Sequence, residues 1–482
     1  MKRRLALAVA IVLALVGVAL ARPGGGESFS GGGGHGGSGG GGGGGGQLVF
    51  ELVYWLFRLA FYYPQIGLPM IAIIVGAVIY SAYKQHQNKD WDSGPPVALK
   101  QAVSLDAVRD VDPDFSRVLF EDFAFRLFST AYRASSSPET LATVAPYVSR
   151  AARDAISARG LGVVESVVVG ALRTFRADIE PDRVRIGVEF EANVSTKDAT
   201  YYSVETWLYG RDATRTTKPP SATKGFPCPN CGAPWQSNAT GTQVCASCGE
   251  VVDNGRFDWV VEQITIMSSD SRPPTVTKEV PERGTDLPTY RQHDVQQQWA
   301  ALEADDPALT EQNLVARLAM IYKELNAAWS NNELRPTRGL VSDGLYDYLQ
   351  YWVDAYQKQG LRNQLTDMSI LATLVAKVAR DKWFDAITIR VWAQGKDFVV
   401  RGTTGQVVRG SKHRVRKYSE YWTLIRSRSK KGAPIAQPVC SNCGAPLNIT
   451  MAGACEHCGA HLTAGEFDWV LSKIEQDDTY RG

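Results

Sequence analysis

The chain repeats one pattern of residues, and this repeat restricts its fold more than any other feature of the sequence. Phe257–Ile264, which reads Phe-Asp-Trp-Val-Val-Glu-Gln-Ile, matches Phe467–Ile474, which reads Phe-Asp-Trp-Val-Leu-Ser-Lys-Ile. A Cys-x-x-Cys-Gly-Ala-Pro motif begins at Cys228, upstream of the first copy, and another begins at Cys440, upstream of the second. Because self-similarity at a long interval indicates duplicated structural units, we expect two homologous domains.

Shorter matches extend this repeat toward the N-terminus. Tyr202–Trp207 resembles Tyr418–Thr423, and an Asp-Pro step opens each unit, at Asp112 and at Asp306. The stretch 268–294 between the units is rich in proline and charge. Such a composition is typical of a linker between domains.

Within each unit, helical spacing comes first and alternation follows. Phe115–Arg133 carries Phe and Leu at helical spacing, and Ser137-Pro138 is typical of a helix start. From Val184 to Val194 apolar residues alternate with mostly polar ones, as in a strand with one buried face. We therefore predict an α+β fold, with helices on one face of a curved antiparallel sheet. Further strands are expected at 201–209, 257–266, 386–393, 418–426 and 467–474, and further helices near 308–330 and 339–359.

All eight cysteines lie in Cys-x-x-Cys pairs, which points to metal binding. The two pairs are separated by 13 residues (232–244) in the first unit and by 11 (444–454) in the second. This is close to the spacing of two knuckles that supply four thiolates to one tetrahedral ion. We predict two structural Zn²⁺ ions in two zinc ribbons; disulfides or redox dithiols are the alternatives. The predicted ligands are Cys228, Cys231, Cys245 and Cys248 in the first ribbon, and Cys440, Cys443, Cys455 and Cys458 in the second.

Two apolar segments near the N-terminus predict the location of the protein. Basic residues 2–4, the apolar run 5–20 and the small-x-small pattern 19–21 form a bacterial signal sequence, either cleaved or retained as a membrane helix. Ile66–Tyr83 is long enough to cross a bilayer and precedes basic residues. A hairpin of two crossings within 48–82 is the alternative. We favour one crossing into the cytoplasm from the inner membrane, since reduced thiolates suit that compartment.

Composition permits two packed domains. Of the 482 residues, 44% are apolar and 10% aromatic, and the formal net charge is +2. These values exclude a wholly disordered chain and do not favour a general polyanion binder. We predict a signal peptide at 1–21, a glycine-rich disordered linker at 22–46, a membrane segment at 47–84, a linker at 85–104, a first domain at 105–267 with its ribbon at 226–251, a linker at 268–294, and a second domain at 295–476 with its ribbon at 438–462.

The sequence resembles bacterial relatives of the Tim44-like domain family. The resemblance rests on the leader, the glycine tract, the membrane segment with Ile66–Pro69, the Asp-Pro-Asp-Phe opening at Asp112 with Phe120, and the closing Phe-Asp-Trp-Val strands. It covers 105–267 and, mostly through the internal repeat, 295–476. The family includes a mitochondrial inner-membrane subunit that tethers the import motor's chaperone to the translocase. The resemblance implies two nuclear-transport-factor-two-like cone domains; the zinc ribbons depart from the mitochondrial members.

Three functions compete at this point. We favour a non-catalytic, membrane-anchored adaptor with an unidentified protein partner. An enzyme that uses the interior of a cone domain is disfavoured, because no histidine lies between His86 and His293 to form an acid–base pair in the first domain. A Tyr/Asp site is not excluded by this count, but we predict no small-molecule substrate. The third possibility is a binder of anionic lipid or of a small apolar ligand.

The lipid-binding hypothesis rests on Arg401–Lys431, which contains ten basic residues and a single acid, Glu420. A solvated basic strand edge and a surface that docks on anionic headgroups both fit this composition. Specific nucleic-acid binding is not expected, because the first ribbon has few basic residues. The candidate residues for contact with the membrane surface are Arg409, Lys412, Arg414, Arg416 and Lys417.

Overall fold

The computed structural model covers the chain and describes two regions rich in secondary structure. It describes residues 62–65, 69, 76, 79, 103–220, 225–236, 243–271, 287–450, 454–460, 462, 465–477, 480 and 482. Among these residues, no helix combines the length and the apolar character that a bilayer crossing needs. The predicted signal peptide, glycine tract and membrane segment lie outside the described residues, apart from isolated positions.

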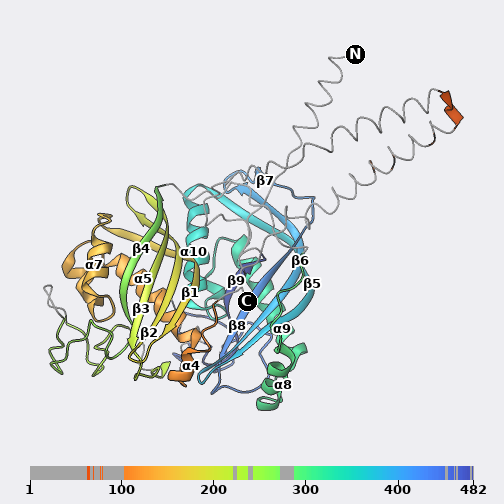
Figure 1. Cartoon of the computed structure of the whole chain (residues 1–482). Coiled ribbons are helices and arrows are strands. Elements are labelled where there is room, and N and C mark those ends of the chain that lie inside the picture. The colour runs from red at the N-terminus through yellow and green to blue at the C-terminus, as the bar shows by residue number, and fades with distance from the viewer. Residues whose placement is uncertain are drawn as a thin grey trace.

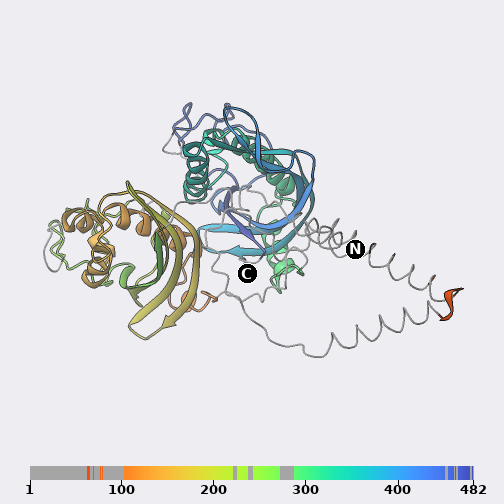
Figure 2. The same cartoon turned by 90° about the horizontal axis from the view of Figure 1, so that it is seen from above.

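The first unit begins with helices and ends with strands (Figure 1). Its elements are α4 (Val108–Val111), α5 (Arg117–Arg133), α6 (Pro138–Leu141), η1 (Ala142–Tyr147), α7 (Arg150–Ser157), β1 (Val164–Ile179), β2 (Arg183–Thr196), β3 (Thr200–Asp212) and β4 (Val260–Ser271). The strands form one antiparallel sheet in the order β1-β2-β3-β4. The sheet curves around the helices on one of its faces (Figure 2), so the predicted α+β fold is confirmed.

The second unit repeats this arrangement. Its elements are α8 (Val295–Asp305), α9 (Glu311–Ser330), η3 (Arg335–Thr337), α10 (Asp343–Lys358), β5 (Leu361–Arg380), β6 (Phe384–Arg401), β7 (Val407–Gly410), β8 (Arg416–Ser427) and β9 (Val470–Gln476). The strands form an antiparallel sheet in the order β5-β6-β8-β9, and β7 pairs with β6. Each cysteine-rich ribbon is therefore inserted between the last two strands of its unit.

Helix α5 packs on the sheet to form the core of the first unit. The Ser116 side chain accepts a hydrogen bond from the backbone N–H of Leu119 at 3.2 Å, which caps the start of the helix. The fully buried Phe128 stacks on Phe190 of β2, with 4.5 Å between ring centroids. The alternating apolar residues between 184 and 194 all join this core. The helix and the strand predicted here are thus confirmed.

Strands β1 and β5, the longest elements of their sheets together with β6, were not predicted from the sequence pattern. The register of β1 against β2 shifts between Val169 and Ala171 and again between Thr174 and Arg176. In β5 a comparable shift occurs around Asp367, whose φ of 56° departs from strand geometry. A β-bulge moves the following side chains to the other face, so these strands lack the strict alternation that identifies β2.

Strand β8 lies inside its sheet, between β6 and β9. The basic stretch 401–431 includes this strand, so its interpretation as a solvated strand edge is wrong for β8, whereas β7 in the same stretch pairs, among the described strands, only with β6. A central strand has both of its backbone edges paired, so its basic residues need another explanation.

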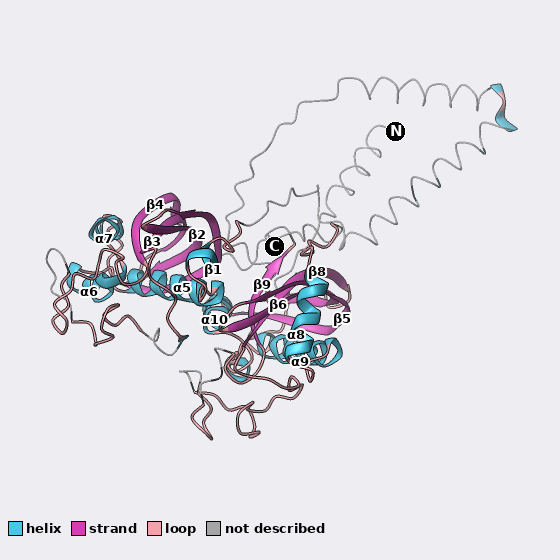
Figure 3. Ribbon diagram, turned by 60° about the horizontal axis from the view of Figure 1, so that its bottom comes forward, coloured by secondary structure: helices cyan, strands magenta, loops and turns pink. Residues whose placement is uncertain are grey.

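The two units pack against each other through α10 (Figure 3). Parallel bridges from Val148 to Val261 and from Val341 to Leu471 show that α7 and α10 occupy equivalent positions. Helix α7 has 8 residues, however, whereas α10 has 16. The longer helix contacts β1 and α5 of the first unit, and Tyr202 of β3 joins the hydrophobic cluster of the second unit. The greater length of α10 thus accounts for part of the contact between the units.

Polar contacts reinforce this contact between the units. Glu121 of α5 accepts from Lys473 of β9 at 2.5 Å and forms an ion pair with Arg117 at 2.8 Å. Lys382, between β5 and β6, forms an ion pair with Asp114 at 2.7 Å. Burial by itself would raise the pKa of Glu121, but the charges of Lys473 and Arg117 outweigh it and lower the pKa to about 2.

We predict that Glu121→Gln destabilises the protein by about 1 kcal/mol at pH 7, because the pair with Lys473 is partly exposed. The folded-state pKa lies below the ordinary value of 4.5, so this contribution is present above about pH 4.5 and is lost as the pH falls toward 2. Urea denaturation at several pH values measures the difference between wild type and variant. Asp122→Asn, on the same helix but outside this ion cluster, is the control. A difference that does not shrink on acidification would contradict the prediction.

Candidate metal centres

The eight cysteines form two clusters, one in each ribbon. In the first cluster, Cys228 and Cys248 have their Sγ atoms 3.9 Å apart, as do Cys231 and Cys245. All four sulfurs of each cluster lie within 4.8 Å of one another. Four sulfurs at this separation match the corners of the tetrahedron that a thiolate-bound ion requires. The structure therefore brings together all eight predicted ligands in two groups that could hold metal ions.

The backbone at each Cys-x-x-Cys pair adopts the turn of a metal-binding knuckle. The N–H of Gly232 donates to the carbonyl of Cys228 at 2.9 Å, and the N–H of Gly444 donates to that of Cys440 at 2.8 Å. Gly232, Gly249, Gly444 and Gly459 all have φ between 70° and 74°. This left-handed conformation favours glycine, which explains why a glycine follows the second cysteine of each pair.

The residues present fit a metal cation, because four sulfur atoms converge within 4.8 Å of one another in each cluster. Burial raises the pKa of Cys228 and of Cys440 to about 12, whereas hydrogen bonds, the largest from the Asn442 side chain, lower the pKa of Cys458 to about 6. His457 is exposed and does not belong to the second cluster, while His461 lies outside the described residues. Each cluster therefore offers four sulfur ligands and a closed coordination sphere.

Each ribbon is held against the helices of its own unit. In the first ribbon, Trp235 donates from Nε1 to the carbonyl of Ala142 at 3.0 Å, and Tyr147 donates from its hydroxyl to the carbonyl of Pro227 at 2.8 Å. In the second ribbon Leu447, which follows the matching Cys-x-x-Cys-Gly-Ala-Pro motif, packs on the hydrophobic core of the unit. The ribbons are thus attached to helices as well as to the sheet.

The aspartate of the Asp-Pro step that opens the first unit, Asp112, forms a buried ion pair near the base of the ribbon. Asp112, fully buried, accepts from Arg211 at 2.7 Å and from the hydroxyl and backbone N–H of Thr217. Arg211 is the next-to-last residue of β3, which precedes the ribbon, and its guanidinium lies 4.4 Å from the ring centroid of Trp259, which follows the ribbon. We call Asp112, Arg211 and Trp259 the first Asp–Arg–Trp cluster.

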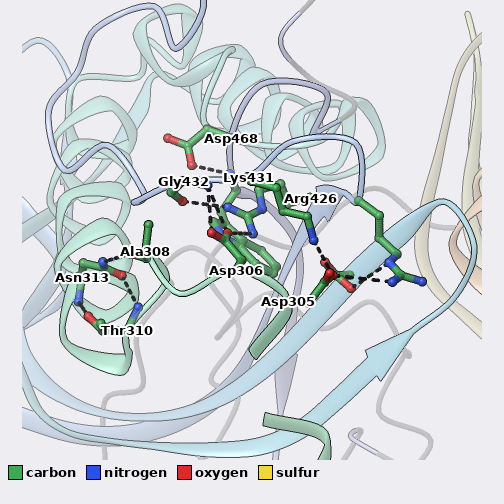
Figure 4. A network of polar contacts seen from close by, with 12 residues as sticks. Asp305, Asp306, Ala308, Thr310, Asn313, Arg426, Lys431, Gly432 and Asp468 are labelled. Carbon is green, nitrogen blue, oxygen red and sulfur yellow. Dashed lines mark hydrogen bonds and ion pairs between the residues drawn. The ribbon is translucent and has the colours of Figure 1, made fainter. Parts of the chain in front are cut away.

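The second unit has the same cluster (Figure 4). Asp306 accepts from Arg426 at 2.7 Å and from the backbone N–H of Gly432 at 3.1 Å. The guanidinium of Arg426 lies 4.6 Å from the ring centroid of Trp469. Each cluster thus joins the start of its unit to both ends of the ribbon insertion. The neighbouring Asp305 is half-exposed and pairs with basic side chains that include Lys431.

Sequence reasoning noted the Asp-Pro steps and the tryptophan strands but did not connect them. The sequence motif that could have connected them is Glu-x-Trp-x-x-x-Arg, which occurs as Glu205–Arg211 and as Glu420–Arg426. In both strands the glutamate accepts from the tryptophan Nε1 two residues later at 3.0 Å. The match proposed between Tyr202–Trp207 and Tyr418–Thr423 is therefore out of register by one residue.

The interior of the first unit contains a buried glutamate with several donors. Glu205 accepts from the hydroxyl of Tyr132 at 2.7 Å, from Arg159 Nη1 at 2.6 Å and from Ser203 Oγ at 2.5 Å, in addition to Trp207. Burial raises the pKa of Tyr132 well above its ordinary value. The carboxylate is thus occupied by structural hydrogen bonds and is not exposed to a substrate.

The five basic residues proposed for lipid contact do not share one exposed surface. Arg409 and Arg416 are buried, Arg414 and Lys417 are half-buried, and Lys412 is exposed. A count of charges in the sequence therefore overstates the basic surface that this stretch presents. Lys412, Arg414 and Lys417 stay candidates for such contact.

This geometry defines a protein of two α+β units, each with a four-cysteine insertion. Residues 295–435 match the family model of the Tim44-like domain, which confirms the resemblance for the second unit. No curated protein matches the chain. Among solved structures, the chain is similar to one described as an Ntf2 like protein involved in plasmid conjugation, at 7% identity and with a TM-score of 0.17, covering 75% of this chain and 98% of that chain.

We predict that Asp306→Ala destabilises the second unit by about 3 to 5 kcal/mol, because it leaves Arg426 buried without its carboxylate. Hydrogen exchange of the β8 and β9 amides measures this locally. Asp305→Asn is the matched control at the adjacent position, and we expect less than about 1 kcal/mol from it, since its ion pairs are exposed to solvent. Equal effects of the two changes would contradict the structural role of the Asp–Arg–Trp cluster.

Proposed function

We propose that the chain is a non-catalytic adaptor, anchored in a bacterial inner membrane, that presents two α+β units and two zinc ribbons to a protein partner. The observation that supports this most directly is the match of 295–435 to the Tim44-like domain model. The buried Glu205 also supports a non-catalytic role, because its carboxylate accepts hydrogen bonds from neighbouring side chains. Catalysis within the first unit would instead require an ionisable group open to substrate.

The proposed anchor is the apolar segment 66–83, which precedes both units in the chain. With a single crossing after a secretory signal, the units lie in the cytoplasm, where thiolates stay reduced for metal binding. Partners of this adaptor are membrane lipids, through the anchor, and an unidentified protein. Contact of Lys412, Arg414 and Lys417 with anionic headgroups is a secondary contribution that we propose with it.

We propose that the ion in each cluster is Zn²⁺, held by Cys228, Cys231, Cys245 and Cys248 in one ribbon and by Cys440, Cys443, Cys455 and Cys458 in the other. Sulfur-only tetrahedral sets favour zinc among the divalent ions. The ion supplies a cross-link between the two knuckles of a segment too small to build its own core.

The first test of this proposal is the metal content of the full chain, purified in detergent without chelator. We expect two zinc ions per chain, and one ion after Cys228→Ser or Cys440→Ser, since each variant removes one of four thiolates. Mass spectrometry of the metal and thiol titration measure both quantities. Chelation should unfold the ribbons and leave the helical circular dichroism nearly unchanged. Fewer than two ions, with the thiols oxidised to disulfides, would exclude the zinc ribbons.

The second test addresses the adaptor role in cells. A photo-crosslinking residue replaces Val163, Met267 or Leu371, whose apolar side chains are 71%, 63% and 47% exposed. We expect a discrete protein adduct in the membrane fraction from at least one of these positions, because the three exposed side chains sample the surfaces of both units. Lys323, an exposed charged position on α9, is the control. The proposal fails if no position gives an adduct, or if deletion of residues 48–83 leaves the adduct unchanged.

A further inference from the structure

The two metal centres share a side chain that the four-cysteine motif does not require. The residue before the second cysteine of the first pair is asparagine in both ribbons, in Cys-Pro-Asn-Cys at Asn230 and in Cys-Ser-Asn-Cys at Asn442. Asn230 Nδ2 lies 3.5 Å from Sγ of Cys248, and Asn442 Nδ2 lies 3.4 Å from Sγ of Cys458. The same contact thus occurs twice, in two ribbons of different sequence.

We propose that Asn230 and Asn442 are positioning residues of the metal centres, which donate a hydrogen bond to the fourth cysteine sulfur and thereby slow release of the ion. This inference rests on the proposed zinc sites and goes beyond them, because it assigns a role to residues that are not ligands. Each asparagine belongs to the first knuckle and its acceptor to the second, so the bond connects the two knuckles directly.

The contact brings the fourth sulfur a donor from the opposite knuckle. In the second ribbon this donor adds to a backbone donor of the sulfur's own knuckle, because the amide of Ala460 donates to Cys458. The first cysteine of each ribbon accepts hydrogen bonds from amides of its own knuckle: those of Asn230 and Cys231 donate to Cys228, and those of Asn442 and Cys443 donate to Cys440. In the second ribbon Cys443 and Cys458 are exposed and Cys440 is buried, while in the first ribbon Cys231 is exposed and Cys248 is half-buried. An exposed thiolate is the ligand that solvent and competing chelators reach first. A side chain from across the site both supplies a donor there and restricts the sulfur to one position.

The chemistry of metal release shows what the hydrogen bond does. For the ion to leave, the Zn–S bond of the exposed thiolate breaks, a donor atom of the chelator takes its place on the ion, and a solvent proton binds the sulfur. An N–H donor stabilises the coordinated thiolate and competes with that proton for the sulfur lone pair. Loss of an outer partner of a metal ligand typically reduces affinity by about 10- to 100-fold. Because Asn442 is exposed, we expect the lower end of this range.

The experiment measures zinc transfer from the full chain, purified in detergent, to 4-(2-pyridylazo)resorcinol. Asn442→Ala should release one of the two ions about tenfold faster, Asn230→Ala should release the other faster, and the double variant should release both faster. Asn448→Ala is the matched control, because Asn448 is an exposed asparagine of the same ribbon. Asn442→Asp keeps the shape and removes the donor, so it should release zinc at least as fast as Asn442→Ala.

A second readout separates this role from a purely structural one. With Co²⁺ in place of zinc, loss of the hydrogen bond should move the sulfur-to-metal charge-transfer band to lower energy. The d–d bands should keep the positions of a tetrahedral four-thiolate site. Wild-type release rates and an unmoved charge-transfer band in the asparagine variants would overturn the inference and leave the zinc centres intact. A wild-type chain without metal would overturn the proposed centres themselves, so the two failures are distinguishable.

Discussion

The buried ion pair between Asp306 and Arg426, present again between Asp112 and Arg211, is the contact on which the rest of each unit depends. It joins three segments that are distant in sequence: the start of the unit, the strand before the ribbon and, through the stacked tryptophan, the strand after it. A buried charge left without its partner is costly, so neither residue can be replaced alone. The ribbon therefore begins and ends at fixed points on the sheet.

The sequence predicts this fold best where one physical requirement acts on successive residues. Burial of one strand face produces the alternation from Val184 to Val194, and the tetrahedral site produces the spacing of the cysteines and their glycines. The serine before Pro138 forms a cap that is local in sequence and was equally predictable. Strands β1 and β5 were missed because bulges interrupt their alternation; the first shift of β1 falls at Gly170, whereas no glycine marks the shift around Asp367 in β5.

The candidate site was less predictable than the metal ligands, because sequence does not report exposure. The basic stretch appeared as a surface, yet Arg426 is buried beside Asp306, and Arg409 and Arg416 are buried as well. A charged residue is ordinarily expected on the surface, and only a paired one lies inside. Comparison of the two repeats could have identified such pairs, since Glu-x-Trp-x-x-x-Arg is preserved while the surrounding residues differ.

The stacking of Arg426 on Trp469, and of Arg211 on Trp259, closes each ribbon at its base. The rest of each ribbon is held together by its cysteine ligands and packs against helices. The strands of the sheet keep their register without it. The insertion is therefore free to change in length over evolution, as the unequal 13- and 11-residue spacings within one chain already illustrate.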